Sequence, residues 1–412
     1  MTLQNAEMSV LAEIDTMADI MLDQVRAWSA VNSGSRNLSG LSEMADTLAE
    51  AFGVLGPVSQ VEPAPVEEVN AEGDATSVAL GRNLHLHIRP EAQTRVLLTG
   101  HMDTVFSAHH PFQRSRWIDR STLSGPGVAD MKGGLAVMLA VLKAFETSEF
   151  ASNLGYEVII NSDEEISSPG SAALLADAAR RVQAALTYEP ALSDGTLAGA
   201  RKGSGNFSIV VRGHAAHAGR DPQNGRNAIV AAADIAVSLS ELCLDGVSVN
   251  PAKIDGGGPS NMVPELAVLR LNIRSTNHAE QSEALSRLWA TVRDAEVRHG
   301  VSAHIHGCFS RPAKPMDARQ IGLFRMVQAC GSDIGLGISW RDTGGVCDGN
   351  NLAACGLPVV DTMGVRGGGI HTPDEFLCVE SLVERAKLST LVLMRIAQGR
   401  LRTAPQELIF QD

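Results

Sequence analysis

RVLLTGHMDTV, residues 95–105, joins a short apolar run to a histidine and an aspartate. The run from Arg95 to Thr99 predicts a buried strand, because a few consecutive aliphatic residues that stop at a glycine are typical of one. His101 and Asp103 then follow the carboxyl end of that strand. Since ligands of open α/β sheets gather at this edge, the stretch predicts both a class of fold and the position of a site.

Strands and helices alternate on both sides of this stretch. The predicted helices cover about residues 8–28, 42–55, 133–145 and 170–181, and the predicted strands cover 156–161 and 184–188. Alternation of this kind is typical of a mainly parallel sheet flanked by helices. The predicted fold class is therefore α/β, and a last helix over 379–397 belongs to the same domain.

The pattern changes after Glu189-Pro190, where half-buried strands and two helices follow. The strands are predicted over 207–212, 248–254, 266–273 and 302–307, and the helices over 227–242 and 279–298. The order β-α-β-β-α-β is that of a ferredoxin-like sandwich. We expect this α+β unit, residues 201–314, to be inserted into a first domain of residues 1–200 and 315–412. Glycines in Arg201–Gly205 make this junction either a hinge or an ordinary linker.

The composition fits a globular protein that binds a small molecule. With 412 residues, 44% of them hydrophobic and 20% charged, the chain can bury more than one core. Its net charge of −13 disfavours nucleic acid and anionic membranes as partners, because both attract basic surfaces. The six cysteines form no C-x-x-C pair, which predicts free thiols. No export signal or membrane-spanning run is visible, so we expect a cytoplasmic protein.

Histidine and acidic residues recur where the predicted strands end. In chain order they are His101, Asp103, Asp130, Glu164, Glu165, Glu189 and His371. Imidazole and carboxylate groups are zinc ligands, and a two-metal site needs a carboxylate that bridges the ions. An H-x-D or a Glu-Glu pair alone is common in solvated loops. The combination, at successive strand ends, predicts a metal centre.

Six motifs give the chain a resemblance to a known enzyme family. They are HMDTV (101–105), GPGVADMKGG (125–134), SDEEISSPGS (162–171), YEP (188–190), GHAAHAG (213–219) and HTPDE (371–375). On these motifs the sequence resembles the M20 family of metallopeptidases, in its glutamate carboxypeptidase (carboxypeptidase G2-like) branch. The resemblance spans nearly the whole chain. It implies a zinc-exopeptidase-like catalytic domain and an inserted lid that also forms a homodimer.

The resemblance implies a role for each ligand of a two-metal centre. Asp130 would bridge the ions, His101 and Glu189 would complete one ligand set, and Glu165 and His371 the other. Zinc is the expected metal, although manganese and cobalt accept the same ligands.

Two further carboxylates are expected to act without ligating. Asp103 would hydrogen-bond the imidazole of His101. Two dications and three ligand carboxylates leave one positive unit, which a bridging hydroxide would neutralise. Glu164 would then act as general base, taking the proton of the attacking water and delivering it to the departing amine.

Four residues of the inserted unit and its exit match substrate contacts of the family. His217 would stabilise the oxyanion in its own or the partner subunit's site, and Asn261 and Arg274 would grip a carboxylate. Arg311 resembles a substrate-contacting arginine. The expected reaction is hydrolysis of an amide bond beside a free carboxylate, on a glutamate-like C-terminal residue or an N-acyl amino acid. The alternatives are an aminohydrolase or deacetylase, or a non-catalytic metal-binding scaffold.

Other candidate groups receive structural interpretations. Cys347 stands where relatives commonly have serine, and we expect a small buried residue at the approach to the site. Two H-x-H pairs, His85/His87 and His304/His306, could ligate metal from one strand face. Since Leu84 and Leu86 alternate with the first pair, these histidines are expected on the solvated side of a strand.

Overall fold

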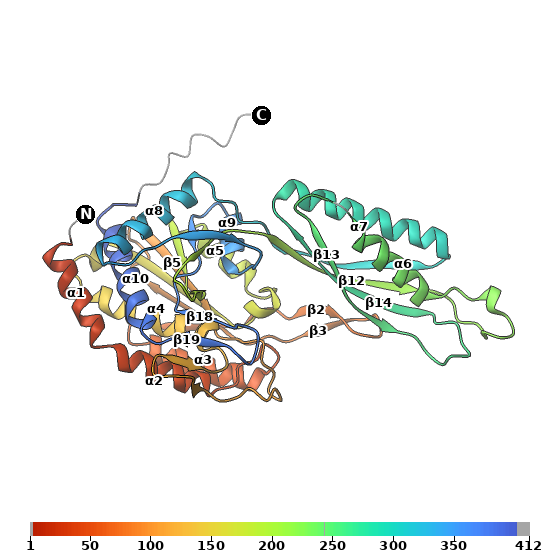
Figure 1. Ribbon diagram of the computed structural model, residues 1–412, viewed down its shortest axis with the longest axis horizontal. Helices are drawn as coiled ribbons and strands as arrows, with labels where there is room; N and C mark the ends of the chain where they lie inside the picture. The colour runs from red at the N-terminus through yellow and green to blue at the C-terminus, as the bar shows by residue number, and fades with distance from the viewer. Residues whose placement is uncertain (1–2, 243, 402–412) are drawn as a thin grey trace.

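The computed structural model describes residues 3–242 and 244–401. Figure 1 shows a larger lobe, which holds both ends of the described chain, and a smaller lobe, residues 203–311, that projects from it. No helix in the described part of the chain is long and apolar enough to cross a membrane. Cys308, Cys330, Cys347, Cys355 and Cys378 are free thiols, whereas Cys243 lies outside the described residues.

A six-stranded sheet forms the centre of the larger lobe, in the order β1-β4-β8-β5-β9-β17. Its strands are β1 (Val58–Val61), β4 (Asn83–Ile88), β5 (Arg95–His101), β8 (Gly155–Asn161), β9 (Ala184–Thr187) and β17 (Val359–Val360). The last four are mutually parallel, while β4 is antiparallel to β8 and β1 to β4. The predicted mainly parallel α/β sheet is confirmed, with β5 reaching two residues farther than expected.

Helices cover both faces of this sheet because its buried strands are apolar on both sides. Val96 and Leu98 of β5 pack in a large hydrophobic cluster with α4 (Gly134–Glu146) and α10 (Ser381–Ala397), whereas Leu97 faces α5 (Ala172–Ala179) and α9 (Asp348–Ala354). The helices of the larger lobe are α1 (Asn5–Asp15), α2 (Ala18–Ser29), α3 (Leu38–Phe52), α4 (Gly134–Glu146), α5 (Ala172–Ala179), α8 (Ala318–Asp333), α9 (Asp348–Ala354) and α10 (Ser381–Ala397).

The first helical stretch differs from the prediction. A single helix over residues 8–28 is expected from the sequence, but the chain breaks between α1 and α2 at Thr16-Met17. The Thr16 hydroxyl donates to the Glu13 carbonyl at 2.7 Å, and the Thr16 and Met17 amides bond three residues back. Such bonds tighten the last turn and end the helix. The helix predicted over residues 42–55 is α3, which begins before residue 42 because Asn37 caps it.

The smaller lobe is a four-stranded antiparallel sheet covered by two helices. Its elements are β12 (Gly203–Arg212), α6 (Ala228–Ser240), β13 (Ser248–Gly256), β14 (Leu266–Ser275), α7 (His278–His299) and β15 (Ser302–Arg311). The strand order β13-β14-β12-β15 is that of the predicted ferredoxin-like sandwich. Ile209 and Leu269 pack with Ile235 and Leu288 in a separate hydrophobic cluster.

Short strands that carry no periodic signal complete the larger lobe. A second sheet, β10-β18-β19-β7-β6, and the pairs β11/β16 and β2/β3 are absent from the prediction. Their bounds are β2 (Val66–Val69), β3 (Ala75–Val78), β6 (Arg116–Trp117), β7 (Thr122–Ser124), β10 (Ala191–Leu192), β11 (Leu197–Arg201), β16 (Trp340–Thr343), β18 (Arg366–Gly368) and β19 (Phe376–Cys378).

The β2–β3 hairpin reaches from the larger lobe to the sheet of the smaller one (Figure 1). Arg270 of β14 donates to the Val69 carbonyl at 2.9 Å, and Arg212 of β12 donates to the Gly73 carbonyl at 3.2 Å. The hairpin therefore contacts the smaller lobe at a place remote in sequence from the chain crossings.

The chain crosses between the lobes twice, and the two crossings are tied together. Arg201 and Lys314 exchange two backbone hydrogen bonds of 2.9 and 3.0 Å. Both side chains also bind Asp361, with Arg201 Nε and Lys314 Nζ at 2.8 and 2.7 Å from Oδ2. Burial alone would raise the pKa of Asp361, but the two cations outweigh it and hold that pKa below its ordinary value.

Candidate metal centre

The ends of β5, β8 and β9 bring the predicted ligands to one edge of the central sheet. His101 is the last residue of β5, Glu164 and Glu165 follow β8, and Glu189 follows β9. Asp130 comes from the turn Val128–Gly133, and His371 comes from the loop between β18 and β19. These residues form two groups, His101/Glu164/Glu189 and His101/Asp130/Glu165. Within each group, one ligand atom of each residue lies within 4.8 Å of the others.

His101 is held so that one ring nitrogen faces the acids. Nδ1 lies 3.0 Å from the backbone oxygen of Asp103 and 3.3 Å from its Oδ1. Nε2 lies 3.1 Å from Oδ1 of Asp130 and 3.8 Å from Oε1 of Glu189. A proton on Nδ1 is therefore used toward Asp103, which leaves the Nε2 lone pair for a ligand position.

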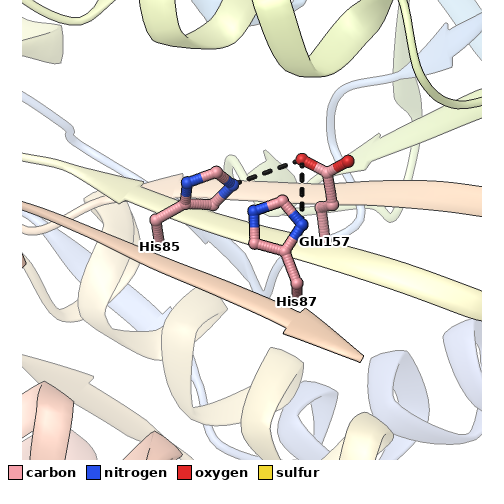
Figure 2. Close-up of side chains that lie close together, drawn as sticks. All are labelled: His85, His87 and Glu157. Carbon is pink, nitrogen blue, oxygen red and sulfur yellow. Dashed lines mark hydrogen bonds and ion pairs between the residues drawn. The ribbon is translucent and has the colours of Figure 1, made fainter. Parts of the chain in front are cut away.

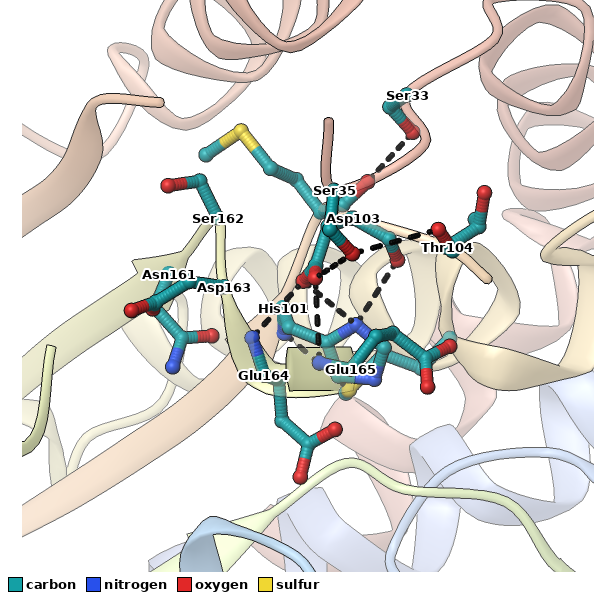
Figure 3. Close-up of polar contacts among 12 residues, drawn as sticks. Ser33, Ser35, His101, Asp103, Thr104, Asn161, Ser162, Asp163, Glu164 and Glu165 are labelled. Carbon is teal, nitrogen blue, oxygen red and sulfur yellow. Dashed lines mark hydrogen bonds and ion pairs between the residues drawn. The ribbon is translucent and has the colours of Figure 1, made fainter. Parts of the chain in front are cut away.

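Asp103 also fixes both glutamates of the next strand end (Figure 3). Its Oδ1 accepts the Glu164 amide, and its Oδ2 accepts the Glu165 amide, each at 3.1 Å. Ser35 donates its hydroxyl to Oδ2 at 2.7 Å. This buried carboxylate thus orients an imidazole and the backbone of two acidic residues, which is more than the sequence predicted for it.

His371 completes the second group of ligands. Its Nε2 lies 3.2 Å from Oδ2 of Asp130 and 3.1 Å from Oε2 of Glu165. The two oxygens of Asp130 therefore face different histidines, which is the position expected of a bridging carboxylate. His371 has φ of 63°, a left-handed conformation that is uncommon outside glycine and that clusters at functional sites.

Glu375 supports the turn that carries Asp130. Its Oε1 accepts the amides of Ala129 and Asp130 at 2.9 and 3.1 Å, and its Oε2 accepts the Gly127 amide at 3.0 Å. The HTPDE motif contains this residue, but nothing in the sequence indicates the backbone that it binds. Glu375 is thus a supporting residue that sequence reasoning missed.

The electrostatics of the cluster are those of crowded, buried acids. Burial, followed by the charge of Asp130, raises the pKa of Glu165 to about 7, and burial also raises the pKa values of Glu164 and Glu189. Burial alone would raise the pKa of Asp130, but hydrogen bonds from two histidines hold it well below the usual range. Hydrogen bonds with Asp130 and Glu165 raise the pKa of His371 to about 11.

These residues fit divalent cations. Their donors are imidazole nitrogens and carboxylate oxygens, the set that zinc, manganese and cobalt bind. Oε1 of Glu189 is buried and accepts no hydrogen bond from the described residues, although buried acceptors are almost always satisfied. A cation among these oxygens would offset both their mutual repulsion and the unmet acceptor.

A cavity of about 760 Å³ opens beside the cluster, and three arginines line it. Arg201, Arg274 and Arg341 share its wall with the carboxylates, and Arg274 Nη1 donates to the Gly344 carbonyl at 2.5 Å across the two lobes. Guanidinium groups bind carboxylates through paired hydrogen bonds. Arg274 was predicted at the substrate. The sequence predicts no substrate contact for Arg201, which it places at the junction of the two units, or for Arg341. Neither residue stands in a recognisable substrate-binding pattern.

Arg311 forms ion pairs with Glu164 and Asp348. It is fully buried and does not line the cavity. Its guanidinium contacts Asp348 and lies 2.8 Å from Oε1 of Glu164 and 2.9 Å from the hydroxyl of Ser168. These partners hold Arg311 against Glu164. Its expected contact with the substrate stays a prediction.

His217 and Asn261 lie together on exposed loops of the smaller lobe. The Ala218 amide donates to the Asn261 carbonyl at 2.9 Å, and His217 Nδ1 accepts the Gly219 and Arg220 amides at 3.1 Å. Neither side chain lines the cavity of its own chain. Their expected roles stay predictions.

Cys347 lines the cavity and is buried, as expected. Its sulfur accepts the Gly349 amide at 3.3 Å at the start of α9. Burial raises the pKa of this thiol well above its ordinary value, so the uncharged form dominates.

Comparisons with known proteins find relatives over most of the chain. The model of peptidase family M20/M25/M40 matches residues 97–395. Carboxypeptidase G2 of Pseudomonas sp. (strain RS-16) is 26% identical over 364 residues, 85% of this chain and 86% of its own. Succinyl-diaminopimelate desuccinylase of Pseudoalteromonas translucida (strain TAC 125) is 26% identical over 69% of this chain and 79% of its own. The Bacillus subtilis YXEP protein, described as a dinuclear metal binding peptidase, shares the fold with a TM-score of 0.64 at 14% identity, over 93% of this chain and 99% of its own.

Proposed function

The chain belongs to peptidase family M20/M25/M40 and is a metallohydrolase, and from this premise we propose that it hydrolyses an amide bond beside a free carboxylate. The observation that carries the proposal is the meeting of three arginines and the ligand cluster in one cavity. The cluster accounts for the hydrolysis, and the arginines account for an anionic substrate.

We propose that two divalent ions, zinc by preference, are held by five residues. Asp130 would bridge them, with His101 and Glu189 on one side and Glu165 and His371 on the other, which the distances among these groups support. The chemistry supplied at such a centre is Lewis acidity, which polarises a carbonyl and lowers the pKa of water.

Glu164 is proposed as the general base. It lines the cavity, lies three residues after the end of β8, and belongs to the group of His101 and Glu189. Asp103 fixes its amide and Arg311 its carboxylate, so the side chain is oriented before substrate binds. In this position Glu164 would accept the proton of the attacking water and pass it to the leaving amine.

Arg274, Arg201 and Arg341 are proposed to bind the substrate carboxylate. The names of two relatives, carboxypeptidase G2 and succinyl-diaminopimelate desuccinylase, support substrates with a C-terminal amino acid or an N-acyl group. We therefore propose a glutamate-like C-terminal residue or an N-acyl amino acid as the substrate class.

The distal lid residues are proposed to act across a homodimer. Since His217 and Asn261 do not reach the cavity of their own chain, we propose that each serves the partner subunit's site, His217 at the oxyanion and Asn261 at the carboxylate. The division into a catalytic domain, residues 1–200 and 315–412, and a lid, residues 201–314, is part of this proposal.

A matched pair of substrates tests the proposed function. The zinc-, manganese- or cobalt-loaded protein is assayed on N-acyl glutamates and dipeptides, and on the same molecules with the α-carboxylate converted to a carboxamide. We expect kcat/KM to fall by about 10²-fold or more for the amide, because the arginines lose their ionic partner. In Arg274→Ala, the ratio of kcat/KM between the acid and the amide substrate should be smaller than in the wild type.

Two outcomes would contradict the proposal. Equal turnover of acid and amide would favour an aminohydrolase or deacetylase with a neutral subsite. Full metal content without hydrolysis of any N-acyl amino acid, N-acetyl compound or dipeptide would favour a metal-binding scaffold.

A further inference from the structure

A second, separate group of metal-ligand side chains lies on the central sheet, and we propose that His85, His87 and Glu157 form a third divalent-cation site (Figure 2). One ligand atom of each residue lies within 4.8 Å of the others. None of the three belongs to the ligand cluster at the strand ends. The proposal therefore stands independently of the proposed hydrolysis.

The pairing of β4 with β8 brings the three side chains to one face. The strands are antiparallel, with His87 opposite Glu157 and His85 opposite Ile159. Since side chains alternate along a strand, both histidines and Glu157 point to the same side. Leu84 is buried on the other side, as the sequence predicted. The predicted solvated position is wrong for His85, whose side chain is only 11% exposed.

The distances suit a shared ion. Oε2 of Glu157 lies 3.2 Å from Nε2 of His85 and 3.8 Å from Nδ1 of His87, and the two ring centroids are 4.0 Å apart. Ligand atoms at about 2.0–2.1 Å from one tetrahedral zinc are separated by roughly 3.3 Å. Small side-chain rotations would thus be enough to place an ion between these atoms.

The protonation states also suit a ligand set. Burial, followed by the neighbouring His85, lowers the pKa of His87, which favours the neutral imidazole that binds metal. Burial would raise the pKa of Glu157, but hydrogen bonds with His85 and Arg181 outweigh it and lower the pKa to about 2. The carboxylate is therefore ionised at neutral pH.

Arg181 orients the carboxylate without using up the ligand oxygen. Its Nε donates to Oε1 of Glu157 at 3.0 Å and its Nη2 to Oε2 at 2.9 Å. Each carboxylate oxygen has two lone pairs, so Oε2 keeps one for an ion. The charge of Arg181 opposes a cation, and we expect weaker binding here than at the strand-end cluster. Two imidazoles and one carboxylate favour zinc-like ions over magnesium or calcium.

The other H-x-H pair provides a matched control. His304 and His306 have the same spacing on β15, and their rings are 4.5 Å apart. Within the described residues no carboxylate or thiol completes a three-ligand group with them. A difference between the two pairs would therefore report the contribution of Glu157.

Zinc stoichiometry tests the site. Metal-free protein is titrated with buffered free zinc, and bound zinc is measured by equilibrium dialysis with elemental analysis. We expect two tighter equivalents and one weaker equivalent in the wild type. His87→Ala should lose only the weaker one, because its side chain is 38% exposed and its removal leaves the fold intact. His306→Ala should keep all three.

A second measurement uses thermal unfolding, since an ion that binds only the folded state raises Tm. After the tighter equivalents are bound, further zinc should raise the Tm of the wild type and of His306→Ala but not of His87→Ala. A wild type that never exceeds two equivalents, or a His87→Ala protein that keeps the third, would overturn the proposal. Loss of the third equivalent in His306→Ala would place it elsewhere. If His87→Ala lost the tighter equivalents and kept the weaker one, the proposal would also be overturned, because His87 would then support the strand-end cluster.

Discussion

Asp103 illustrates how much of the site depends on one carboxylate at the residue scale. It accepts two backbone amides and a hydroxyl while its backbone and side chain lie against the imidazole of His101. We expect Asp103→Asn to weaken metal binding by about 10- to 100-fold, because an amide nitrogen cannot accept these hydrogen bonds. Competition with a chromophoric chelator measures this affinity. Ser35→Ala, which removes one bond only, serves as the control, and equal losses in both variants would contradict the role of Asp103.

Glu164 and Glu165 are neighbours in sequence but are expected to respond differently. Glu164→Gln should keep both ions and lose about 10²- to 10⁴-fold in kcat, because the proton acceptor is removed. Glu165→Gln should release metal, since its carboxylate faces His371. Elemental analysis and steady-state kinetics separate the two effects. Metal loss in Glu164→Gln would reassign this residue as a ligand.

Three of the proposed ligands, His101, Glu165 and Glu189, could be grouped from the sequence because they lie at or after the ends of β5, β8 and β9, where sequence order and position in space coincide. His101 and Glu189 follow apolar runs, and the HTPDE motif contains His371. Arg311 could not be placed in this way. Its direction depends on Asp348 and Ser168, which lie far from it in sequence.

At the scale of elements, most long periodic segments were predictable and most short strands were not, although the long helix α8 is also absent from the prediction. The helix α4 is buried on nearly all sides and α7 on one face, and over several turns each leaves a clear pattern of apolar residues. Strands of two or three residues, such as β6 and β18, are defined by their partners instead. The second sheet and the loop that carries His371 were missed for this reason.

The two chain crossings depend on the ionised form of Asp361. Because its pKa is depressed in the fold, its contribution to stability is complete above the pKa of the unfolded chain, about 3.9, and is lost as the pH falls through the lower folded value. Asp361→Asn should therefore reduce the free energy of unfolding by about 3–5 kcal/mol at neutral pH, since Arg201 and Lys314 stay buried without their partner.

Thermal unfolding between pH 3 and pH 7 measures this contribution. The fall in Tm with acidification should be smaller in Asp361→Asn than in the wild type. Asp294→Asn, on the exposed face of α7, is the control and should follow the wild type. Parallel pH curves for all three proteins would show that Asp361 does not contribute.

At the scale of the whole molecule, the proposed exchange of His217 between subunits has a direct consequence. Glu164→Gln and His217→Ala proteins are each expected to be inactive alone. After their subunits exchange, roughly half of the dimers are mixed, and each mixed dimer has one intact site, so about a quarter of wild-type activity should return. Sedimentation velocity would check that dimers are present. No recovery after complete exchange would place His217 in its own subunit's site.

The two lobes could be predicted because each has its own alternation of strands and helices. The contact of the β2–β3 hairpin with the smaller lobe could not, since it depends on Arg212 and Arg270 meeting backbone carbonyls about 140 and 200 residues earlier in the chain. Such contacts follow from the packing of the complete molecule and leave no periodic pattern.

Because the two chain crossings are paired, the smaller lobe could be removed or exchanged as one segment. Its first and last strands are neighbours, with Ser204 opposite Arg311 in the register of β12 and β15. A segment whose two ends meet can be cut out or exchanged while the host chain is closed by a short linker. We expect residues 203–311, expressed alone, to show cooperative thermal unfolding by circular dichroism, because their hydrophobic cluster is self-contained. Lids of related hydrolases could then be grafted here to change which substrates the same metal centre receives.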